Sequence, residues 1–554
     1  MKSSIQKLTT AIFLSALLAF SLHSCPAAAQ EAGIPATSES QSFYESRQVQ
    51  VVIHGDTNRD GKLDDSDCDG RERWSWQAGA FVMANLDDDD RSGKPDAYDQ
   101  IVNGSIDEQD LARFRVLFDP ALPSGAEITV DASDAPVNIF QNSGNGWKFL
   151  TNQTPLVLAA SGRIELGIEA KKFAGVDGWN GRIVLRATVR LDGRIVAEDQ
   201  AEARVAPWLM LPNSAPTRAF YLATGKYDNS AMMAEVKNIL PRWGVAFPTP
   251  HLAKNWQEMW LQDSLEIGYT EIPGGARMYV VLNGIRGADS FGPTLLGRDI
   301  GVITVGKNRG MTGHDAWVDW FGNLEVSHPT REYPFGRIYY GRNTDSGVGL
   351  HPDVVRFLEA QILQDPFWVD TSWLAIKHVD EIFNVLPGSD GRGVVIMGQP
   401  AAAAAVLGQP LDAFNREIQD KLDRMLNGGN YVIKGQTVKY PGIRALLGVP
   451  AERFVPLPVL YAPVQVDASS NRPGAHNKWS NPVNSVFLNG NVLLGGAHMP
   501  AAVKTDITRR LKAAGVGEVA FVNDQVYQDR WGNVHCSSNT LKQLPAGGFW
   551  TRIR

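Results

Sequence analysis

Cysteine is scarce in this chain of 554 residues, which holds only Cys25, Cys68 and Cys536. Exported proteins that depend on disulfides carry a larger, evenly spaced set. The low count therefore excludes a disulfide scaffold, and a single bridge between Cys68 and Cys536 stays open as an alternative. A basic excess is also lacking, because the formal net charge is -7 and the pI is about 5.9. Nucleic-acid binding needs a basic face, so we expect no nucleic-acid partner and favour a cationic substrate.

Long hydrophobic runs are lacking beyond the N-terminal segment AIFLSALLAF, residues 11–20. This run is shorter than the roughly 20 residues of a membrane-spanning helix. Lys2 and Lys7 precede it and three alanines, residues 27–29, follow it, which is the pattern of a secretory signal. We therefore expect a signal peptide at residues 1–29, an exported protein (secreted or periplasmic), and no transmembrane segment after its removal. The segment LHSC, residues 22–25, leaves a lipid anchor at Cys25 as the second alternative.

A cluster of prolines predicts a domain boundary in the segment APWLMLPNSAPT, residues 206–217. We expect one domain over residues 45–207 and another over 215–554. In the first, residues 184–191 alternate between apolar and polar side chains, and Asp192-Gly193 follows as a tight turn. This pattern predicts a β-sandwich.

The second half alternates short apolar strands with helical segments, which is typical of the α/β class. Its strand candidates are VITVG, RIYYG, VVIMG and VAFVN, and Asn489-Gly490 predicts a hairpin. The clearest helix is DAFNREIQDKLDRMLNGG, with Asp412 placed to cap its start and Gly428 its end. Phe414, Ile418, Leu422, Met425 and Leu426 share one face of that helix, and the alanine run 401–405 is expected to be helical as well.

An acidic loop, DTNRDGKLDDSD, lies near the start of the sandwich half. Asp56, Asn58, Asp60 and Asp64 fall at ligand positions of a calcium loop, and a glycine stands where the sharp turn is needed. Asp67, at the twelfth position, is shorter than the glutamate of the full pattern. We predict a Ca²⁺ site here.

A second acidic stretch contains four consecutive aspartates, which repel one another unless cations neutralise them. A solvated acidic loop is the alternative, and oxygen-rich side chains at alternate positions favour calcium. The candidate ligands are Asn85, Asp87, Asp89, Asp96, Asp99 and Asp110.

Three polar clusters interrupt the apolar segments of the second half. They surround Asp263, His378 with Asp380, and Cys536. Singly, each has a structural explanation, since free cysteine is often a buried core residue. Together they form a nucleophile set: a histidine lowers the pKa of a thiol and then serves as acid and base. Two carboxylates beside a thiolate need a cationic partner, and a planar guanidinium matches them in charge and in donor geometry.

The ordered strings WLQDSLEIGY, FGNLEVS, YPFGRI, HVDEIFNVLP, NPVNSVFL and NVHCSSNT resemble the catalytic domain of the protein-arginine deiminases. The acidic segments from Asp56 to Asp110 resemble the calcium-binding sandwich domain of that family. The resemblance runs from about residue 50 to the end of the chain. It implies an α/β fold in which a five-bladed ββαβ propeller (pentein) follows an immunoglobulin-like β-sandwich.

The resemblance also implies roles for individual residues. Asp263, His378, Asp380 and Cys536 stand at the four catalytic positions, and Trp260, Arg286 and Arg530 stand at substrate-binding positions. One calcium site beside the active centre is implied by Gln262, Glu266 and Glu325 with the backbone oxygens of Phe321 and Leu324. A second such site is expected to be weak, because Ser264, Asn283, Gly284 and Gly287 stand in place of stronger ligands. Separately, Ala288 replaces an arginine that helps to hold the peptide backbone of the substrate.

The expected activity is hydrolysis of arginine side chains in proteins or peptides to citrulline, with release of ammonia. Cys536 would attack the guanidinium carbon and form a thiouronium, and His378 would protonate the leaving ammonia and then activate water. Deimination of free arginine or of another small guanidino compound is one alternative. A secreted calcium-binding protein without catalysis is the alternative from another class.

Overall fold

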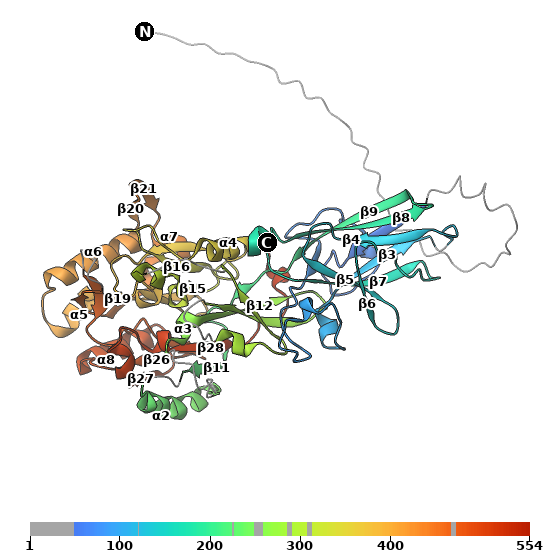
Figure 1. Cartoon of the computed structure of the whole chain (residues 1–554). Helices are drawn as coiled ribbons and strands as arrows, with labels where there is room; N and C mark the ends of the chain where they lie inside the picture. The colour runs from blue at the N-terminus through green and yellow to red at the C-terminus, as the bar shows by residue number, and fades with distance from the viewer. Residues whose placement is uncertain are drawn as a thin grey trace, which may run out of the picture.

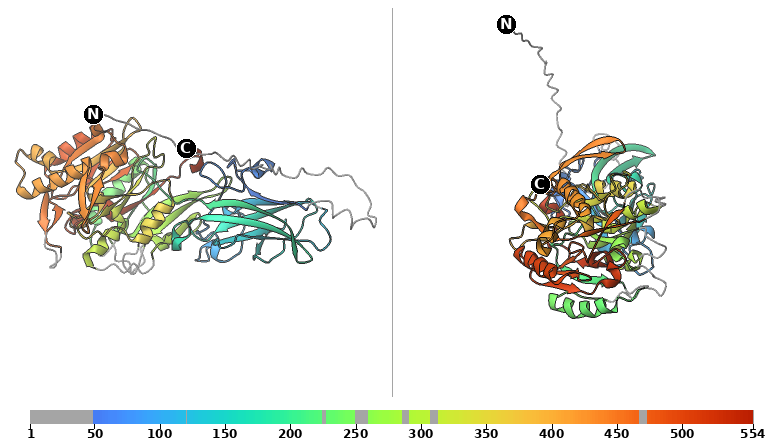
Figure 2. Two further views of the ribbon diagram at one scale, coloured as in Figure 1. Left: turned by 90° about the horizontal axis from the view of Figure 1, so that it is seen from above. Right: turned by 90° about the vertical axis from the view of Figure 1, so that its left-hand side faces the viewer.

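The computed structural model describes residues 49–119, 121–223, 227–248, 259–284, 291–306, 313–466 and 473–553. The expected signal peptide and Cys25 lie outside these residues. The described chain is elongated, with a β-rich part at one end and an α/β part at the other (Figures 1 and 2). Within these ranges, no helix is both long enough and apolar enough to cross a bilayer.

Two sheets make up the β-rich part, and their inward-facing side chains share one core that includes Ile53, Phe114 and Val189. Every pairing is antiparallel except that of β2 with β9. The first sheet has the order β1 (Val51–Gly55), β3 (Ala112–Phe118), β7 (Arg163–Ala170), β5 (Val137–Asn142), β6 (Trp147–Leu150). The second has the order β2 (Ala80–Val82), β9 (Arg194–Val205), β8 (Arg182–Leu191), β4 (Glu127–Asp131).

Both hairpins predicted from Asp-Gly and Asn-Gly pairs are confirmed. Asp192 and Gly193 join β8 to β9 with φ of 49° and 75°. Asn489 and Gly490 join β25 (Val486–Leu488) to β26 (Asn491–Gly495) with φ of 48° and 87°. Positive φ at both central residues gives the turn twist that matches paired strands, and asparagine, aspartate and glycine adopt it at little cost.

The α/β part repeats one unit five times within the described residues. In each unit a first strand pairs antiparallel with a second, and a third strand or bridge pairs parallel with the second. The units are β12 (Leu265–Glu271), β13 (Arg277–Asn283), β14 (Ile300–Thr304); β15 (Leu324–Val326), β16 (Ile338–Arg342), β17 (Phe367–Asp370); β18 (Phe383–Pro387), β19 (Gly393–Gln399), β22 (Phe454–Pro458); β25, β26, β27 (Val519–Val522); and β28 (Ser538–Lys542), β11 (Thr217–Leu222), Ala246.

Helices connect the second and third strands of most units. They are α2 (Ser230–Ile239), α4 (Pro352–Ala360), α5 (Pro400–Leu407), α6 (Ala413–Asn427) with α7 (Ile443–Leu447), and α8 (Ala501–Ala513). The predicted helix is confirmed as α6: the Asp412 side chain accepts from the backbone N–H of Asn415 at 2.7 Å, and Gly428 ends the helix with φ of 91°. Two hairpins complete the part, β20 (Gly429–Ile433) with β21 (Gln436–Tyr440), and β23 (Tyr461–Val464) with β24 (Gly474–Asn477).

Trp208 lies at the junction of the two parts, inside the segment where the proline cluster predicted a boundary. It is fully buried, and its ring N–H donates to the Val280 carbonyl at 3.0 Å. Its backbone N–H donates to the Gln361 side chain at 2.9 Å. The next residues form β10 (Leu209–Met210), which pairs with β12, the strand that lies between the two parts in Figure 1. The backbone N–H of Ala206 donates to the Val82 carbonyl of β2 at 2.8 Å, so the boundary segment contacts both parts.

Short helical turns precede the first strand of several units and bring them together at one place. They are α3 (Leu261–Ser264) before β12, η8 (Phe321–Asn323) before β15, η9 (Val379–Glu381) before β18, and α10 (Val534–Ser537) before β28. Residues of α3 lie against both α10 and η8, and η8 lies against η9. Side chains on these turns therefore point toward a common centre from separate parts of the sequence.

Candidate active site

Cys536 lies on α10 and is only 3% exposed. Its Sγ is 3.3 Å from Asp380 Oδ2 and 3.1 Å from the Asn484 side-chain amide nitrogen. Its backbone N–H donates to the Asn484 side-chain oxygen at 3.2 Å. The thiol is free, so the alternative of a bridge between Cys68 and Cys536 is wrong.

Burial raises the pKa of the Cys536 thiol well above its usual range, and the negative charges of Asp380 and Glu381 raise it further. The thiol is therefore protonated at neutral pH when no cation is near it. A cation placed among these groups would favour the thiolate, which is the nucleophilic form.

Asp380 uses one of its two carboxylate oxygens for all of its described hydrogen bonds. Oδ2 accepts from the Asn484 amide at 2.8 Å, lies 2.9 Å from His535 Nδ1, and accepts from the Cys536 thiol. Oδ1 is buried and has no hydrogen-bond partner among the described residues. One oxygen is thus fixed by protein groups, and the other is left for a donor that enters the site.

Asp263 and His378 form the other pair of the predicted catalytic set. His378 Nδ1 is 3.5 Å from Asp263 Oδ1, and His378 Nε2 is 2.8 Å from the Trp317 carbonyl oxygen. Since a carbonyl only accepts, Nε2 carries a proton and Nδ1 faces the carboxylate. The backbone N–H of Gly322 donates to Asp263 Oδ1 at 3.2 Å. A Cβ at Gly322 would come within 2.7 Å of both side chains, so glycine is needed there.

The predicted substrate-binding residues are only partly described. Trp260 immediately precedes α3, and its ring centroid is 5.7 Å from that of Tyr527. The Arg530 guanidinium lies 3.7 Å above the Tyr227 ring and donates to the Val526 carbonyl at 2.8 Å. Arg286 lies outside the described residues. Their roles toward a substrate therefore stay predictions.

An acidic cavity of about 50 Å³ lies next to the predicted catalytic residues, and its lining includes Gln262, Glu266, Glu325, His535 and Lys542. The structure thus brings together the three side chains that were predicted to hold calcium. Burial and the charge of Glu325 raise the pKa of Glu266 well above its usual range, and burial raises the pKa of Glu325 to about 7. Such buried carboxylates are stabilised by a cation.

Two basic side chains of the protein already face this cavity. Lys542 donates to the Thr217 hydroxyl at 3.1 Å, and burial lowers its pKa to about 8 against the opposing pull of Glu325 and Glu266. His535 Nε2 is 3.1 Å from Glu325 Oε1. Burial opposes the charged form of His535, but Glu325 and Asp380 outweigh it and raise its pKa.

The backbone positions predicted to complete this site belong to a turn. The Phe321 carbonyl accepts from the backbone N–H of Leu324, which closes η8. At the second, weak site, the described residues contact one another: the Ser264 hydroxyl donates to the Trp260 carbonyl at 3.2 Å, and the backbone N–H of Gly284 donates to the Ser264 carbonyl at 2.7 Å. Gly287 and Ala288 lie outside the described residues.

The second acidic stretch forms two carboxylate clusters in the β-rich part. One oxygen each of Asp87, Asp89 and Asp110 lies within 4.8 Å of the others. The same holds for Asp88, Asp90 and Asp96. Burial raises the pKa of Asp87 to about 8, of Asp89 to about 6, of Asp96 to about 7 and of Asp110 to about 10, and neighbouring carboxylates add to each shift.

The sequence prediction was incomplete for these clusters. Asp88 and Asp90 belong to the second cluster but were not singled out. Asp99 lies outside both, since its carboxylate accepts from the backbone N–H of Ile101 and from the Asn103 amide, each at 2.8 Å. Asn85 donates to Glu169 at 2.8 Å, while its own side-chain oxygen is buried without a partner among the described residues.

The first acidic loop is held by its own backbone. The Asp56 carboxylate accepts from the backbone N–H of Gly61 at 3.0 Å. The Asn58 side-chain oxygen accepts from the backbone N–H of Asp60 at 2.9 Å, and the Asp60 carboxylate accepts from the backbone N–H of Lys62 at 2.8 Å. Asp64 caps the turn that follows. These residues form no three-carboxylate cluster among the described residues, so calcium at this loop stays a prediction.

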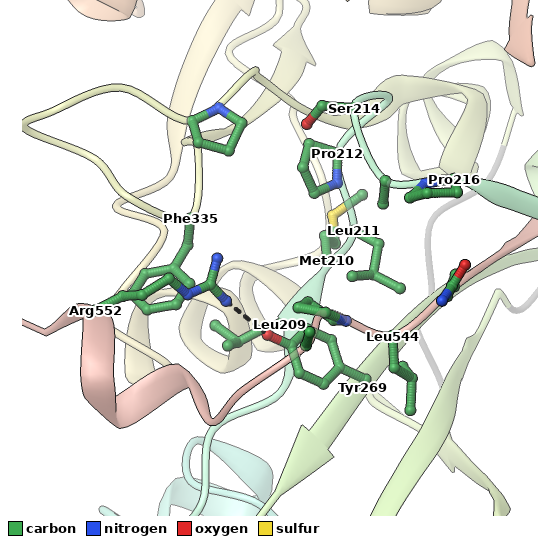
Figure 3. Close-up of a pocket in the computed structure, with 15 residues that line it drawn as sticks. Leu209, Met210, Leu211, Pro212, Ser214, Pro216, Tyr269, Phe335, Leu544 and Arg552 are labelled. Carbon is green, nitrogen blue, oxygen red and sulfur yellow. Dashed lines mark hydrogen bonds between the residues drawn. The ribbon is translucent and has the colours of Figure 1, made fainter. Parts of the chain in front are cut away.

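A separate pocket of about 330 Å³ lies on the other side of Met210 and Leu211, which line both cavities. Its wall is mostly apolar, and Arg552 reaches into it and donates to the Tyr269 hydroxyl at 3.2 Å (Figure 3). None of the four predicted catalytic residues lines it. The predicted chemistry therefore does not involve this apolar pocket, and it is assigned to the polar centre around Cys536 and Asp380.

Sequence reasoning missed two residues of that centre, Asn484 and His535. Both stand in strings that carried the family resemblance, NPVNSVFL and NVHCSSNT. The sequence shows that His535 precedes Cys536, but it does not indicate that the imidazole ring lies between Glu325 and Asp380.

Comparisons with known proteins find similar sequences over most of the chain. The family model for protein-arginine deiminase (PAD) matches residues 195–421. Human protein-arginine deiminase type-4 is 24% identical over 91% of this chain and 83% of its own length. Human type-3 is 29% identical over 64% of this chain and 57% of its own.

Among solved structures, the agmatine deiminase of C. jejuni is 10% identical, with a TM-score of 0.36, over 61% of this chain and 96% of that one. The agmatine deiminase of Enterococcus faecalis gives the same values. TM-scores this low do not establish a shared fold. The sequence matches to these relatives extend over most of the chain, which is therefore similar to the protein-arginine deiminases.

Proposed function

We propose that this protein hydrolyses arginine side chains of proteins or peptides to citrulline and releases ammonia. The observation that carries the proposal is the contact of the buried Cys536 thiol with Asp380, beside the Asp263–His378 pair. Two carboxylates around a thiol suit a guanidinium, which is always charged and donates in two directions from one plane. The named activity of the relatives supports a protein substrate.

In the first half-reaction, Asp263 and Asp380 bind the guanidinium nitrogens and hold its carbon against Cys536. The positive charge of the substrate offsets the groups that keep the thiol protonated, so the thiol gives up its proton as the substrate binds, and His378 takes that proton up. The Cys536 sulfur then bonds to the guanidinium carbon, and a carbon–nitrogen bond breaks. His378 gives a proton to the departing nitrogen, which leaves as ammonia, and a thiouronium remains on Cys536.

In the second half-reaction, His378 takes a proton from water. The oxygen of that water bonds to the same carbon, and the carbon–sulfur bond breaks. The product is neutral citrulline, His378 returns a proton to the sulfur, and the second proton of the water leaves to the ammonia or to solvent. The charge of the substrate is lost in this step, so the two carboxylates no longer hold the product by an ion pair.

Calcium is the cofactor that we propose. The Asp87, Asp89 and Asp110 cluster fits it, because these carboxylates converge within 4.8 Å and buried oxygens of Asp87 and Asp89 have no hydrogen-bond partner among the described residues. Beside the active centre, Gln262, Glu266 and Glu325 would hold a further ion. Bound there, calcium would supply positive charge that keeps the buried carboxylates ionised.

The finer architecture is proposed on the same basis. The five repeated units support a five-bladed propeller of the pentein type over residues 215–554. The two packed sheets support an immunoglobulin-like sandwich over residues 45–207. The sequence pattern of residues 1–29 supports export of the protein by way of a signal peptide.

The test is citrulline and ammonia release from an arginine peptide with blocked ends, compared with free arginine, in calcium and in chelator. We expect turnover of the peptide at a higher kcat/KM than that of free arginine, and none by Cys536→Ser. Preference for free arginine would favour the small-molecule alternative. A folded protein that turns over neither substrate in either condition would contradict the proposal.

A further inference from the structure

His535 holds two carboxylates at once. The residue precedes Cys536 on α10, and its ring is almost buried, with 15% of the side chain exposed. Nδ1 lies 2.9 Å from Asp380 Oδ2, and Nε2 lies 3.1 Å from Glu325 Oε1. Since both partners are acceptors, both ring nitrogens donate. The imidazole therefore links the catalytic centre to the acidic cavity.

The contact with Asp380 determines which oxygen of that carboxylate stays available. His535 and Asn484 both donate to Oδ2, from α10 and from the segment before β25. Two donors from different elements fix the plane of a carboxylate better than one, because rotation would break both bonds. Oδ1 is then left buried and without a partner among the described residues.

We propose that His535 is a positioning residue: together with Asn484 it holds Asp380 by Oδ2, so that Oδ1 faces the substrate guanidinium. The inference rests on the proposed function, since it assigns Asp380 to guanidinium binding. Glu325 has a supporting role in it, because its contact with Nε2 keeps the ring in the plane from which Nδ1 reaches Asp380. A buried carboxylate oxygen without a donor is costly, and an N–H of the guanidinium would satisfy Oδ1.

Three substitutions separate the two contacts of the ring. The amide nitrogen of asparagine can occupy the place of Nδ1, and that of glutamine the place of Nε2. His535→Asn therefore keeps a donor for Asp380 and loses Glu325, whereas His535→Gln keeps the Glu325 contact and loses Asp380. His535→Leu loses both.

The readout is the Kd for a blocked arginine peptide, measured by calorimetry in the Cys536→Ala background, both in calcium and in chelator. We expect His535→Leu and His535→Gln to weaken binding at least tenfold, and His535→Asn to recover most of that loss. A general effect on packing would not rank asparagine above glutamine. Thermal melts identify any variant that fails to fold, and the comparison of asparagine with glutamine stands without the leucine variant.

The outcomes are distinct. Equal Kd values for asparagine and glutamine, or no loss in either, would overturn the role of His535 while the proposed function stands. The proposed function would be overturned, and this inference with it, by two results together. The folded Cys536→Ala protein would fail to bind the peptide, and the parent protein with Cys536 intact would fail to turn it over.

Discussion

Replacing Asp380 by asparagine removes a charge from the point where the Cys536 thiol, Asn484 and His535 meet. Two costs follow. The guanidinium loses one of its two ionic partners, and the new amide group presents hydrogens where Asn484 and His535 already donate to Oδ2. Removal of one partner from a buried charged pair costs about 3 to 5 kcal/mol. This corresponds to a fall in kcat/KM of roughly 150- to 5,000-fold.

The assay is steady-state ammonia release from the blocked arginine peptide, with kcat and KM determined separately. Asp420→Asn is the matched control, because Asp420 is exposed on α6, away from the centre, and should leave both parameters unchanged. Thermal melts show whether the Asp380 variant is folded. A folded Asp380→Asn protein whose kcat/KM stays within threefold of the parent would refute the assignment of Asp380 to guanidinium binding.

Three further predictions concern titration and metal binding. Because burial keeps the Cys536 thiol protonated, the rate of its alkylation by iodoacetamide in the absence of substrate should rise steeply above pH 8. A rate that does not depend on pH between 6 and 9 would show that Cys536 is already a thiolate without substrate. Burial lowers the pKa of His476 from 6.5 to about 4, so the folded protein keeps this ring neutral, and its free energy of unfolding falls by up to about 3 kcal/mol as the pH falls through that range. In urea melts, the free energy of unfolding of His476→Gln should therefore fall less than that of the parent between pH 7 and pH 4. An equal fall in both proteins would contradict this prediction. Calcium at 100 times its Kd should stabilise the folded protein by about 2.7 kcal/mol per site, which is measured as a rise in Tm. This rise in Tm should be smaller in Asp110→Asn, because Asp110 belongs to the carboxylate cluster. A Tm that does not change with calcium would argue against the site.

Local features of the fold could be predicted because neighbouring residues determine them. The turns at Asp192-Gly193 and Asn489-Gly490 need positive φ, and few residues adopt it cheaply. Helix α6 carries its cap, its apolar face and its terminal glycine within a single segment. In each case the physical cause lies within a few residues of its effect, so a single sequence is enough to identify it.

The connection of the catalytic centre to the acidic cavity could not be predicted in this way. His535 contacts Glu325, which is about 210 residues earlier in the chain, and Asp380, about 155 residues earlier. These residues are far apart in the chain, and they come into contact only when the units of the α/β part lie side by side in the fold. The four predicted catalytic residues were assigned from a family motif, whereas no motif indicated the contacts of His535, which only the structure shows.

The grouping of charges explains why a cation suits this centre. Asp380 and Glu381 act on the thiol, Asp263 lies beside His378, and Glu266 and Glu325 line the adjoining cavity. Against these five acids the described residues supply Lys542, His535 and His378. Burial raises the pKa of Glu381, Glu266 and the thiol well above their usual ranges, so these groups keep protons that a cation would displace. An arginine side chain brings that cation with the substrate, and its conversion to neutral citrulline removes it again. The same imbalance that draws the substrate in therefore favours release of the product, and the centre returns to its protonated state.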